Sequence, residues 1–254
     1  MSKRSPDRRL LACAEYARPG KRFADIGTDH AILPVYLCLH GISPGGIATD
    51  ISRGPLSRAV SNIAAAGLGD RIECRLADGL DGIEGYHPDD IFILGMGGEL
   101  IAEILSGSDY IKKRGIRLVL QPMTHPQDLR RFLSESGFDI TGEKLVSDRQ
   151  IPEDCRRVPA GIRIYQVICA EYVGVRTDDH RPMSSFDPEI AAELLLGRIN
   201  IGRDSRLVRE LAARYAAGCE KAIEGLKAGG KDVTNELGLL RVLNRISGKL
   251  RQNT

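Results

Sequence analysis

The first 170 residues repeat one pattern of hydrophobic and polar positions. Short apolar runs of strand length are followed by stretches in which apolar residues recur every three or four positions. The first kind of run favours a strand, and the second favours a helix with one buried face. Strands that alternate with helices predict an α/β fold with a mostly parallel, Rossmann-like sheet. We expect the strands at 22–26, 46–51, 71–76, 90–94 and 117–120, and the helices at 7–18, 31–39, 54–66, 100–105 and 127–136.

Two later stretches, 144–147 and 164–170, alternate between apolar and polar residues. They predict an antiparallel pair of strands at the sheet edge. The segment 151–162 between them contains two prolines and no regular period, so we expect an irregular connection.

The period changes after a polar, proline-bearing stretch at 174–188, which is typical of a linker. Apolar residues recur at helical spacing over 207–226 and again over 233–250, with Gly229-Gly230 between them. Two amphipathic helices joined by a glycine turn predict a coiled-coil-like hairpin. We therefore expect one domain at 1–173 and a helical hairpin at 189–254. The hairpin could dock RNA, or it could pack on itself or form a weak homodimer of an otherwise monomeric protein.

The strand–turn–helix at 22–34 carries the first candidate chemistry. Asp25 ends the apolar run, Gly27 follows, and Asp29 stands where a dinucleotide-binding turn would place its second glycine. A carboxylate there would repel phosphates, but it suits a ligand with positive charge. S-adenosylmethionine carries an ammonium and a sulfonium. The alternative is an ordinary turn without a ligand.

Three further strand ends carry polar or glycine-rich sequence. Asp50 is placed to accept hydrogen bonds from the hydroxyls of a ribose, although a turn or helix-capping aspartate would look the same. Asp78 can reach the edge of an adenine. The run Gly95-Met96-Gly97-Gly98 lets backbone approach a ligand closely, or it is simply a flexible turn before a helix.

Charge is distributed unevenly along the 254 residues. The formal net charge is +2, but residues 197–254 hold 12 Lys and Arg against 6 Asp and Glu. Further basic residues surround the first helical pattern, among them Arg8 and Arg9. This distribution favours an RNA partner for the C-terminal part.

The six cysteines have no paired or histidine-partnered spacing, which argues against a zinc site and against a disulfide framework. We expect no metal and reduced thiols, as in a cytoplasmic protein. No stretch approaches 18 apolar residues, and the N-terminus is polar, so we expect neither a membrane span nor a signal peptide.

Five motifs together resemble the bacterial tRNA (adenine-N1)-methyltransferases that act on position 22 of tRNA. The likeness covers residues 8 to about 150, and its most specific part is the GMGG run with LQP after it. The segment 151–163 departs from that family because it is longer and richer in arginine. The motifs are Asp25–Ala31, Asp50–Leu56, Ala77–Leu80, Gly95–Leu100 and Leu120–Met123.

The resemblance implies a class I methyltransferase domain that uses S-adenosylmethionine, with a C-terminal coiled-coil hairpin. It implies tRNA as the substrate. The candidate catalytic residues are Asp29, which would stabilise the cationic product, and His30 as a contact to the base. The implied cofactor contacts are Asp25, Gly27, Thr28, Asp29, Asp50, Ile51, Asp78, Gly79, Gly95, Met96, Gly97 and Gly98. The expected RNA contacts are Arg8, Arg9, Arg198, Arg203, Arg206 and Arg209.

Methylation at adenine N1 needs no prior deprotonation, because this nitrogen has a free lone pair. Positioning is then the main catalytic device, and a carboxylate such as Asp29 would stabilise the cationic product as it forms. The glycines at 95–98 would leave room for a base that has left its stack. Two other functions stay open: a non-catalytic RNA-binding or scaffold protein with this fold, and a small-molecule methyltransferase.

Overall fold

The computed structural model describes residues 5–113, 115–155, 157–174, 186–203 and 205–248. Contacts within the chain divide it into two compact units. The first consists of residues 1–146 and 165–175, and the second of residues 147–164 and 176–254. The expected boundary placed the whole of 1–173 in one domain, whereas in the structure residues 147–164 pack with the C-terminal helices. Most of the expected linker, residues 175–185, lies outside the described residues.

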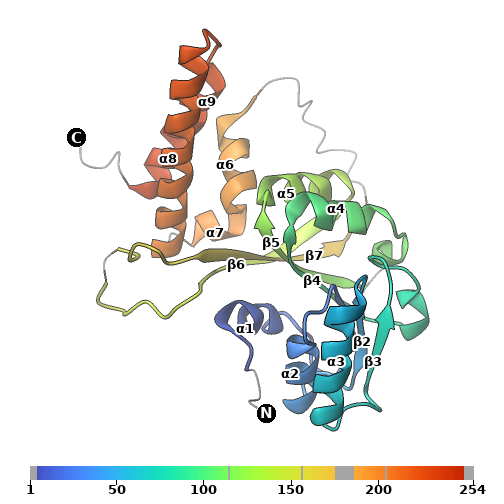
Figure 1. Cartoon of the computed structure of the whole chain (residues 1–254). Coiled ribbons are helices and arrows are strands. Elements are labelled where there is room, and N and C mark those ends of the chain that lie inside the picture. Colours follow the sequence, from blue (N-terminus) through green and yellow to red (C-terminus); the bar gives the residue numbers. More distant parts are fainter. Residues whose placement is uncertain (1–4, 114, 156, 175–185, 204, 249–254) are drawn as a thin grey trace. The chain divides into compact units, whose positions relative to one another are not determined.

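The first unit is built on a seven-stranded sheet of the predicted α/β class (Figure 1). The strand order is β3-β2-β1-β4-β5-β7-β6. Strands β1 to β5 run parallel, and β7 pairs antiparallel with β5, which confirms the antiparallel edge. The bounds are β1 Phe23–Ile26, β2 Gly46–Asp50, β3 Ile72–Leu76, β4 Asp90–Gly97, β5 Arg117–Thr124, β6 Phe138–Ser147 and β7 Ile164–Tyr172.

Helices cover both faces of this sheet, so successive residues of a central strand bury their side chains in opposite directions. Ile91 and Ile93 of β4 point into one apolar cluster, and Phe92 points into the other. Two short 3₁₀ helices, Ile83–Tyr86 and Tyr110–Lys112, complete the unit. Helices α1 Arg8–Ala14, α2 Ile32–Leu39 and α3 Arg53–Ala65 pack on the Phe92 face, and α4 Gly98–Ser106 and α5 Pro126–Glu135 pack on the other.

Most of the glycine-rich run continues strand β4, although a turn after residue 94 was expected. Strand β4 continues to Gly97, with a shift in its register against β5 around Gly95, whose φ is +78°. Helix α4 then begins directly at Gly98. A Cβ added to Gly98 would lie 2.1 Å from the carbonyl oxygen of His125. The close approach of two backbones at the ends of β4 and β5 therefore requires glycine here.

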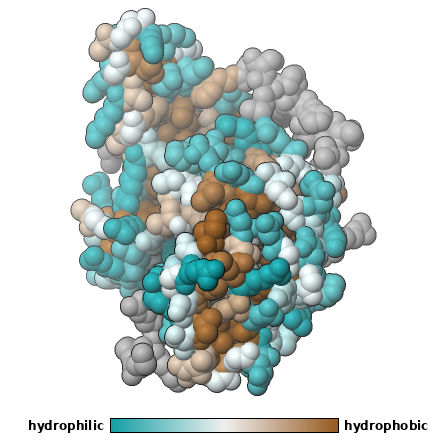
Figure 2. All heavy atoms as spheres, turned by 45° about the vertical axis from the view of Figure 1, so that its right-hand side comes forward, coloured by the Kyte–Doolittle hydropathy of each residue, from teal (hydrophilic) through white to brown (hydrophobic). Residues whose placement is uncertain are grey.

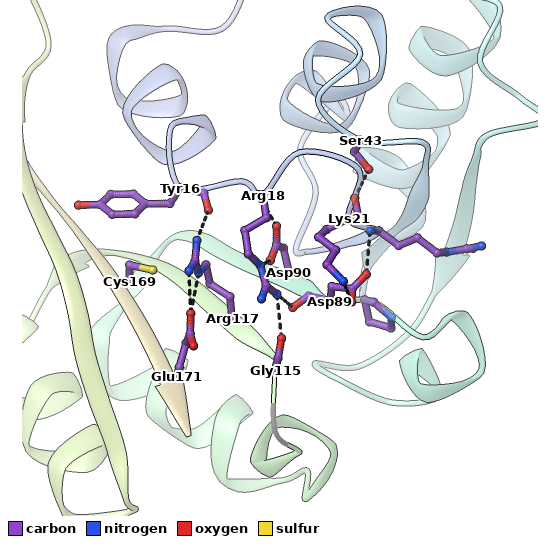
Figure 3. Close-up of polar contacts among 12 residues, drawn as sticks. Tyr16, Arg18, Lys21, Ser43, Asp89, Asp90, Gly115, Arg117, Cys169 and Glu171 are labelled. Carbon is purple, nitrogen blue, oxygen red and sulfur yellow. Dashed lines mark hydrogen bonds and ion pairs between the residues drawn. The ribbon is translucent and has the colours of Figure 1, made fainter. Parts of the chain in front are cut away.

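The amino edge of the sheet is closed by ion pairs (Figure 3). Arg18 donates through Nε to Asp90 Oδ1 at 2.6 Å, and its Nη2 reaches the carbonyls of Asp89 and Gly115. Beside it, Arg117 Nη2 pairs with the Glu171 carboxylate at 2.8 Å. The Arg18 contacts attach the segment after α1 to the start of β4 and to the residues before β5, and the Arg117 pair joins β5 to β7.

The second unit contains four helices in its described residues: α6 Pro188–Leu196, α7 Arg198–Gly202, α8 Arg206–Ala228 and α9 Thr234–Ser247. The predicted hairpin is α8 packed on α9, with Gly230 at φ +69° in the turn. Helices α6 and α7 were not predicted. The apolar residues of α6 form an almost continuous run, which gives no helical period to detect.

The connection between β6 and β7 is irregular in its described residues, as expected, and it belongs to the second unit. Two arginines of α8 hold it by its backbone. Arg206 donates to the carbonyl oxygens of Ile151, Pro152 and Cys155, and Arg214 donates to that of Ile162. A small apolar cluster forms under these bonds from Ile151, Val158 and Ile162, with Cys155 and Leu207 packed against it.

Candidate functional site

The predicted acids meet at the carboxyl edge of the first unit's sheet. Strands β1, β2 and β3 are adjacent and parallel, so they all end at this edge. Asp25 lies in β1, Asp50 is the last residue of β2, and Asp78 follows β3. A hydrogen bond of 2.7 Å from the Thr28 amide to the Thr49 carbonyl holds the turn after β1 against β2.

Asp25 is the most perturbed acid of this edge. Only 7% of it is exposed, and burial raises its pKa from 3.8 to about 7, with the Asp50 charge adding to the rise. The Arg9 guanidinium opposes the shift, which places that cation within electrostatic reach of the carboxylate. A cationic ligand group at this position would favour the ionised form of Asp25.

Asp50 and Asp78 keep bonding capacity. One oxygen of Asp50 accepts the Ser52 amide at 2.7 Å, so the local turn considered as an alternative does exist. The carboxylate of Asp50 has no other partner among the described residues, and that of the exposed Asp78 has none. Both remain available as acceptors.

Apolar side chains also reach the surface of the protein. In the view of Figure 2 they lie among polar side chains. Ile51, directly after Asp50, is 66% exposed, and Met123 in β5 is 48% exposed. An exposed isoleucine beside the predicted ribose acceptor suits contact with a flat base.

Asp29 and His30 lie in a strained turn between β1 and α2. His30 and Ala31 have φ values of +65° and +49°, which are unfavourable for residues other than glycine. Asn62 of α3 donates to the His30 carbonyl at 2.9 Å, a contact that holds this turn. The Asp29 carboxylate is 70% exposed and lies 3.3 Å from His30 Nε2 and 3.4 Å from Arg58 Nη2. Sequence reasoning missed Arg58 and Asn62, because only the fold brings α3 to this turn.

Side chains from β4 and α4 pack over the glycines of this edge. Gly27 has a φ of +70°, and a Cβ added to it would lie 2.1 Å from the Met96 methyl group. Met96 of β4 therefore covers the turn after β1. Gly79 has a φ of +51° and faces Ile104 of α4. The predicted glycine positions on β1, β3 and β4 are thus brought to one edge.

The structure separates the two N-terminal arginines that were predicted together as RNA contacts. Arg8 is exposed, whereas Arg9 turns inward and donates from Nη1 to Gln121 Oε1 at 2.8 Å. The Arg9 guanidinium also lies 5.9 Å from the centre of the Tyr165 ring. The sequence pattern gave no indication that these two neighbouring arginines would differ in exposure.

The four C-terminal arginines lie in α7, α8 and the turn between them. Arg198 and Arg203 are exposed, and Arg209 is half-buried. Arg206 differs from them, because its guanidinium is occupied by three backbone carbonyls. We therefore no longer expect Arg206 to contact RNA.

The described residues contain no cluster of His, Cys, Asp or Glu that could hold a metal ion. All six cysteines are free. None of the helices in the described part of the chain is long and apolar enough to cross a membrane.

A family model described as a methyltransferase domain matches residues 7–152. The chain belongs to this methyltransferase domain family. The matched range includes every predicted cofactor residue and the expected catalytic pair.

Individual relatives show which kind of methyltransferase the chain resembles. The tRNA (adenine(22)-N(1))-methyltransferase of Bacillus subtilis is 39% identical over 142 residues, which cover 56% of this chain and 59% of that enzyme. The alignment thus spans less than two thirds of the relative. The solved structure of the B. subtilis M1A22 tRNA methyltransferase TrmK matches 96% of this chain and 99% of its own, with 26% identity and a TM-score of 0.75. A Streptococcus pneumoniae protein solved in complex with S-adenosyl-L-methionine is 27% identical over 94% of this chain and 98% of its own, with a TM-score of 0.74. The resemblance inferred from the sequence is confirmed.

Proposed function

We propose that the protein transfers the methyl group of S-adenosylmethionine to N1 of an adenine in tRNA, at position 22 as in the B. subtilis relative. The observation that carries this proposal is the match to TrmK over 96% of the chain, because it includes the C-terminal helices as well as the methyltransferase domain. A fold alone would leave the substrate open, since one fold hosts many functions.

The residues at the carboxyl edge fit this cofactor. The buried Asp25 suits its ammonium group, and the Asp50 oxygen without a partner among the described residues suits its ribose hydroxyls. Gly27 has no side chain of its own, and the flexible Met96 side chain lies over it. When bound, S-adenosylmethionine supplies an electrophilic methyl group on a cationic sulfur.

The chain contributes chiefly position and charge to the reaction. Holding the adenine in line with the methyl group can supply about 7–11 kcal/mol of the barrier reduction. Asp29 is the proposed acid that stabilises the methylated, cationic base. Arg58 Nη2 lies 3.4 Å from the Asp29 carboxylate and partly neutralises its charge, and His30 Nε2 lies 3.3 Å from it.

The second unit is the proposed docking surface for tRNA. The charge of residues 197–254, 12 basic against 6 acidic, attracts phosphates. Arg198 and Arg203 are the exposed arginines of α7 and the turn that follows it. Arg8 is the proposed contact from the N-terminal helix.

Methyl transfer to total tRNA, with mapping of the modified base, tests the reaction itself. N1-methyladenine at position 22 supports the proposal. Methylation of a metabolite panel and not of tRNA would favour a small-molecule enzyme, and cofactor binding without any transfer would favour a non-catalytic RNA-binding protein.

The salt dependence of tRNA affinity tests the docking surface. The double variant R198E and R203E should weaken binding and reduce the slope of log affinity against log salt by about 0.7–0.9 for each lost phosphate contact. Cofactor affinity should not change. R22E with K112E, at the amino edge of the first unit, carries the same change of net charge and serves as the control. An equal loss in both double variants would mean a general charge effect and no docking surface.

A further inference from the structure

The guanidinium of Arg9, at the carboxyl edge of the sheet, has N–H donors that make no hydrogen bond within the described residues. Arginine offers five N–H groups in a planar fork. Within the described residues, Arg9 uses Nη1 for Gln121 at 2.8 Å and has a long contact of 3.8 Å from Nε to Asp7. Its side chain is only 21% exposed. A largely buried fork with unused donors suits a ligand that brings acceptors.

Gln121 fixes where this fork points. The Gln121 side chain is fully buried, and its amide nitrogen donates to the Pro122 carbonyl at 2.9 Å. Its oxygen is therefore the end that faces Arg9. A Cβ built on Gly95 would lie 3.5 Å from Arg9 Nη1, so the guanidinium stands beside the open glycine of β4.

We infer that Arg9 binds the carboxylate of the methionine part of S-adenosylmethionine and does not contact RNA. An amino-acid head group carries its ammonium and its carboxylate on one carbon. Asp25 and Arg9 offer a matching pair of opposite charges at the same strand ends. The inference rests on the proposed function for the identity of the cofactor.

A phosphate of RNA fits this position less well. The exposed arginines of the chain, such as Arg8 and Arg198, stand where a backbone can reach them. Arg9 is instead held between a buried glutamine and the Tyr165 ring, with the buried Asp25 within electrostatic reach. A nucleic-acid phosphate brought here would also face the acids of the carboxyl edge.

Calorimetry with two ligands tests the inference. S-adenosylmethionine and decarboxylated S-adenosylmethionine share the sulfonium, the ammonium and the nucleoside, and differ in the carboxylate alone. Wild-type protein should bind the first about 10- to 100-fold more tightly, as expected for a hydrogen-bonded ion pair. R9A should lose this preference by weakening S-adenosylmethionine only. Its unchanged affinity for the decarboxylated ligand would show that the site is intact.

The control R22A removes an exposed arginine at the amino end of β1 and should keep the preference. A preference retained in R9A would overturn the inference. So would a reduced salt slope of tRNA binding in R9A with unchanged cofactor affinity. Failure of the wild type to bind S-adenosylmethionine would overturn the cofactor itself, whereas failure to methylate tRNA would leave the carboxylate contact standing.

Discussion

Charges at the amino edge of the first unit's sheet are paired within the protein, whereas those at the carboxyl edge keep unused bonding capacity. Arg18 and Asp90 satisfy each other, and Arg117 does the same with Glu171 (Figure 3). At the carboxyl edge, Asp50 has one local hydrogen bond, and Asp78 has no side-chain partner among the described residues.

Charges that stabilise the fold can therefore be told apart from charges that bind ligands by their bonding partners, without reference to sequence motifs. A buried or half-buried charge normally finds its partner within the fold, because an unmade bond costs stability. Groups left open on a rigid edge are candidates for a ligand, which would complete them. Substitutions at the amino edge should therefore change stability, and those at the carboxyl edge should change binding and catalysis.

Among the proposed substitutions, we expect the largest effect from one at the amino edge, which lowers the free energy of unfolding. Replacing Arg18 in R18A leaves Asp90, which is 2% exposed, without its cation and should cost about 3 kcal/mol of unfolding free energy. Burial already raises the pKa of Asp90, so protonation relieves part of the loss at low pH, and the loss should grow as the pH rises. Urea unfolding at pH 6 and pH 8 measures this. K21A, which breaks the exposed pair with Asp89, should cost below about 1 kcal/mol, and equal losses in the two variants would contradict the role of burial.

Next in size is the expected loss of catalysis in D29N. The neutral amide keeps the shape and hydrogen bonding of Asp29 but removes the charge that faces the methylated base, so the single-turnover rate should fall about 100-fold. Cofactor affinity and melting temperature should stay close to wild type. E99Q removes another exposed acid of the same edge and provides the control. A wild-type rate in D29N would exclude the electrostatic role.

Cofactor affinity should fall by about 2–3 kcal/mol in D50A, because two ribose hydroxyls would lose a charged acceptor. Isothermal calorimetry gives the dissociation constant directly. D70A, an exposed aspartate before the amino end of β3, is the matched substitution and should change nothing. An unchanged constant in D50A would remove this residue from the site.

The effect expected to be smallest per pH unit is a pH dependence set by Asp25. Its folded pKa of about 7 exceeds the ordinary 3.8, so the free protein holds a proton there below pH 7. The stability linked to this proton is complete below pH 4 and is lost as the pH rises through 7. A ligand ammonium requires the ionised acid, so cofactor affinity should rise with pH, by at most about tenfold per unit, and level off above 7. D25N should give a flat profile between pH 5 and 7.5, and a persistent slope would assign the titration to another group.

The features that could be predicted from the sequence depend on residues that are close together along the chain. The strands, the helices between them and the acids at the strand ends follow from apolar periods and turn residues that are close along the chain. Asp25, Asp50 and Asp78 meet because parallel strands end at one edge, a property of the fold class itself.

Partners that are distant in sequence could not be predicted in this way. Arg8 and Arg9 are neighbours of the same type, and only the position of α1 beside Gln121 gives them different surroundings. Arg58 and Asn62 reach the Asp29 turn from a separate helix. The glycine run was predicted as a turn because glycine is usually unfavourable in a strand, but the register shift at Gly95 accommodates it.

The hydrogen bonds from α8 to the β6–β7 connection have a consequence for the order in which the protein can fold. The chain leaves the first unit after residue 146, returns at 165 and leaves again after 175. During synthesis, the ribosome adds Ile151, Val158 and Ile162 well before Leu207. The arginines that bind the connection, Arg206 and Arg214, are also added later. Strand β7 can join the sheet during this interval, since domains fold largely from the N-terminus. Until α8 emerges, the connection must leave Ile151, Val158 and Ile162 exposed, so the newly made chain is most vulnerable to aggregation and proteolysis at that stage.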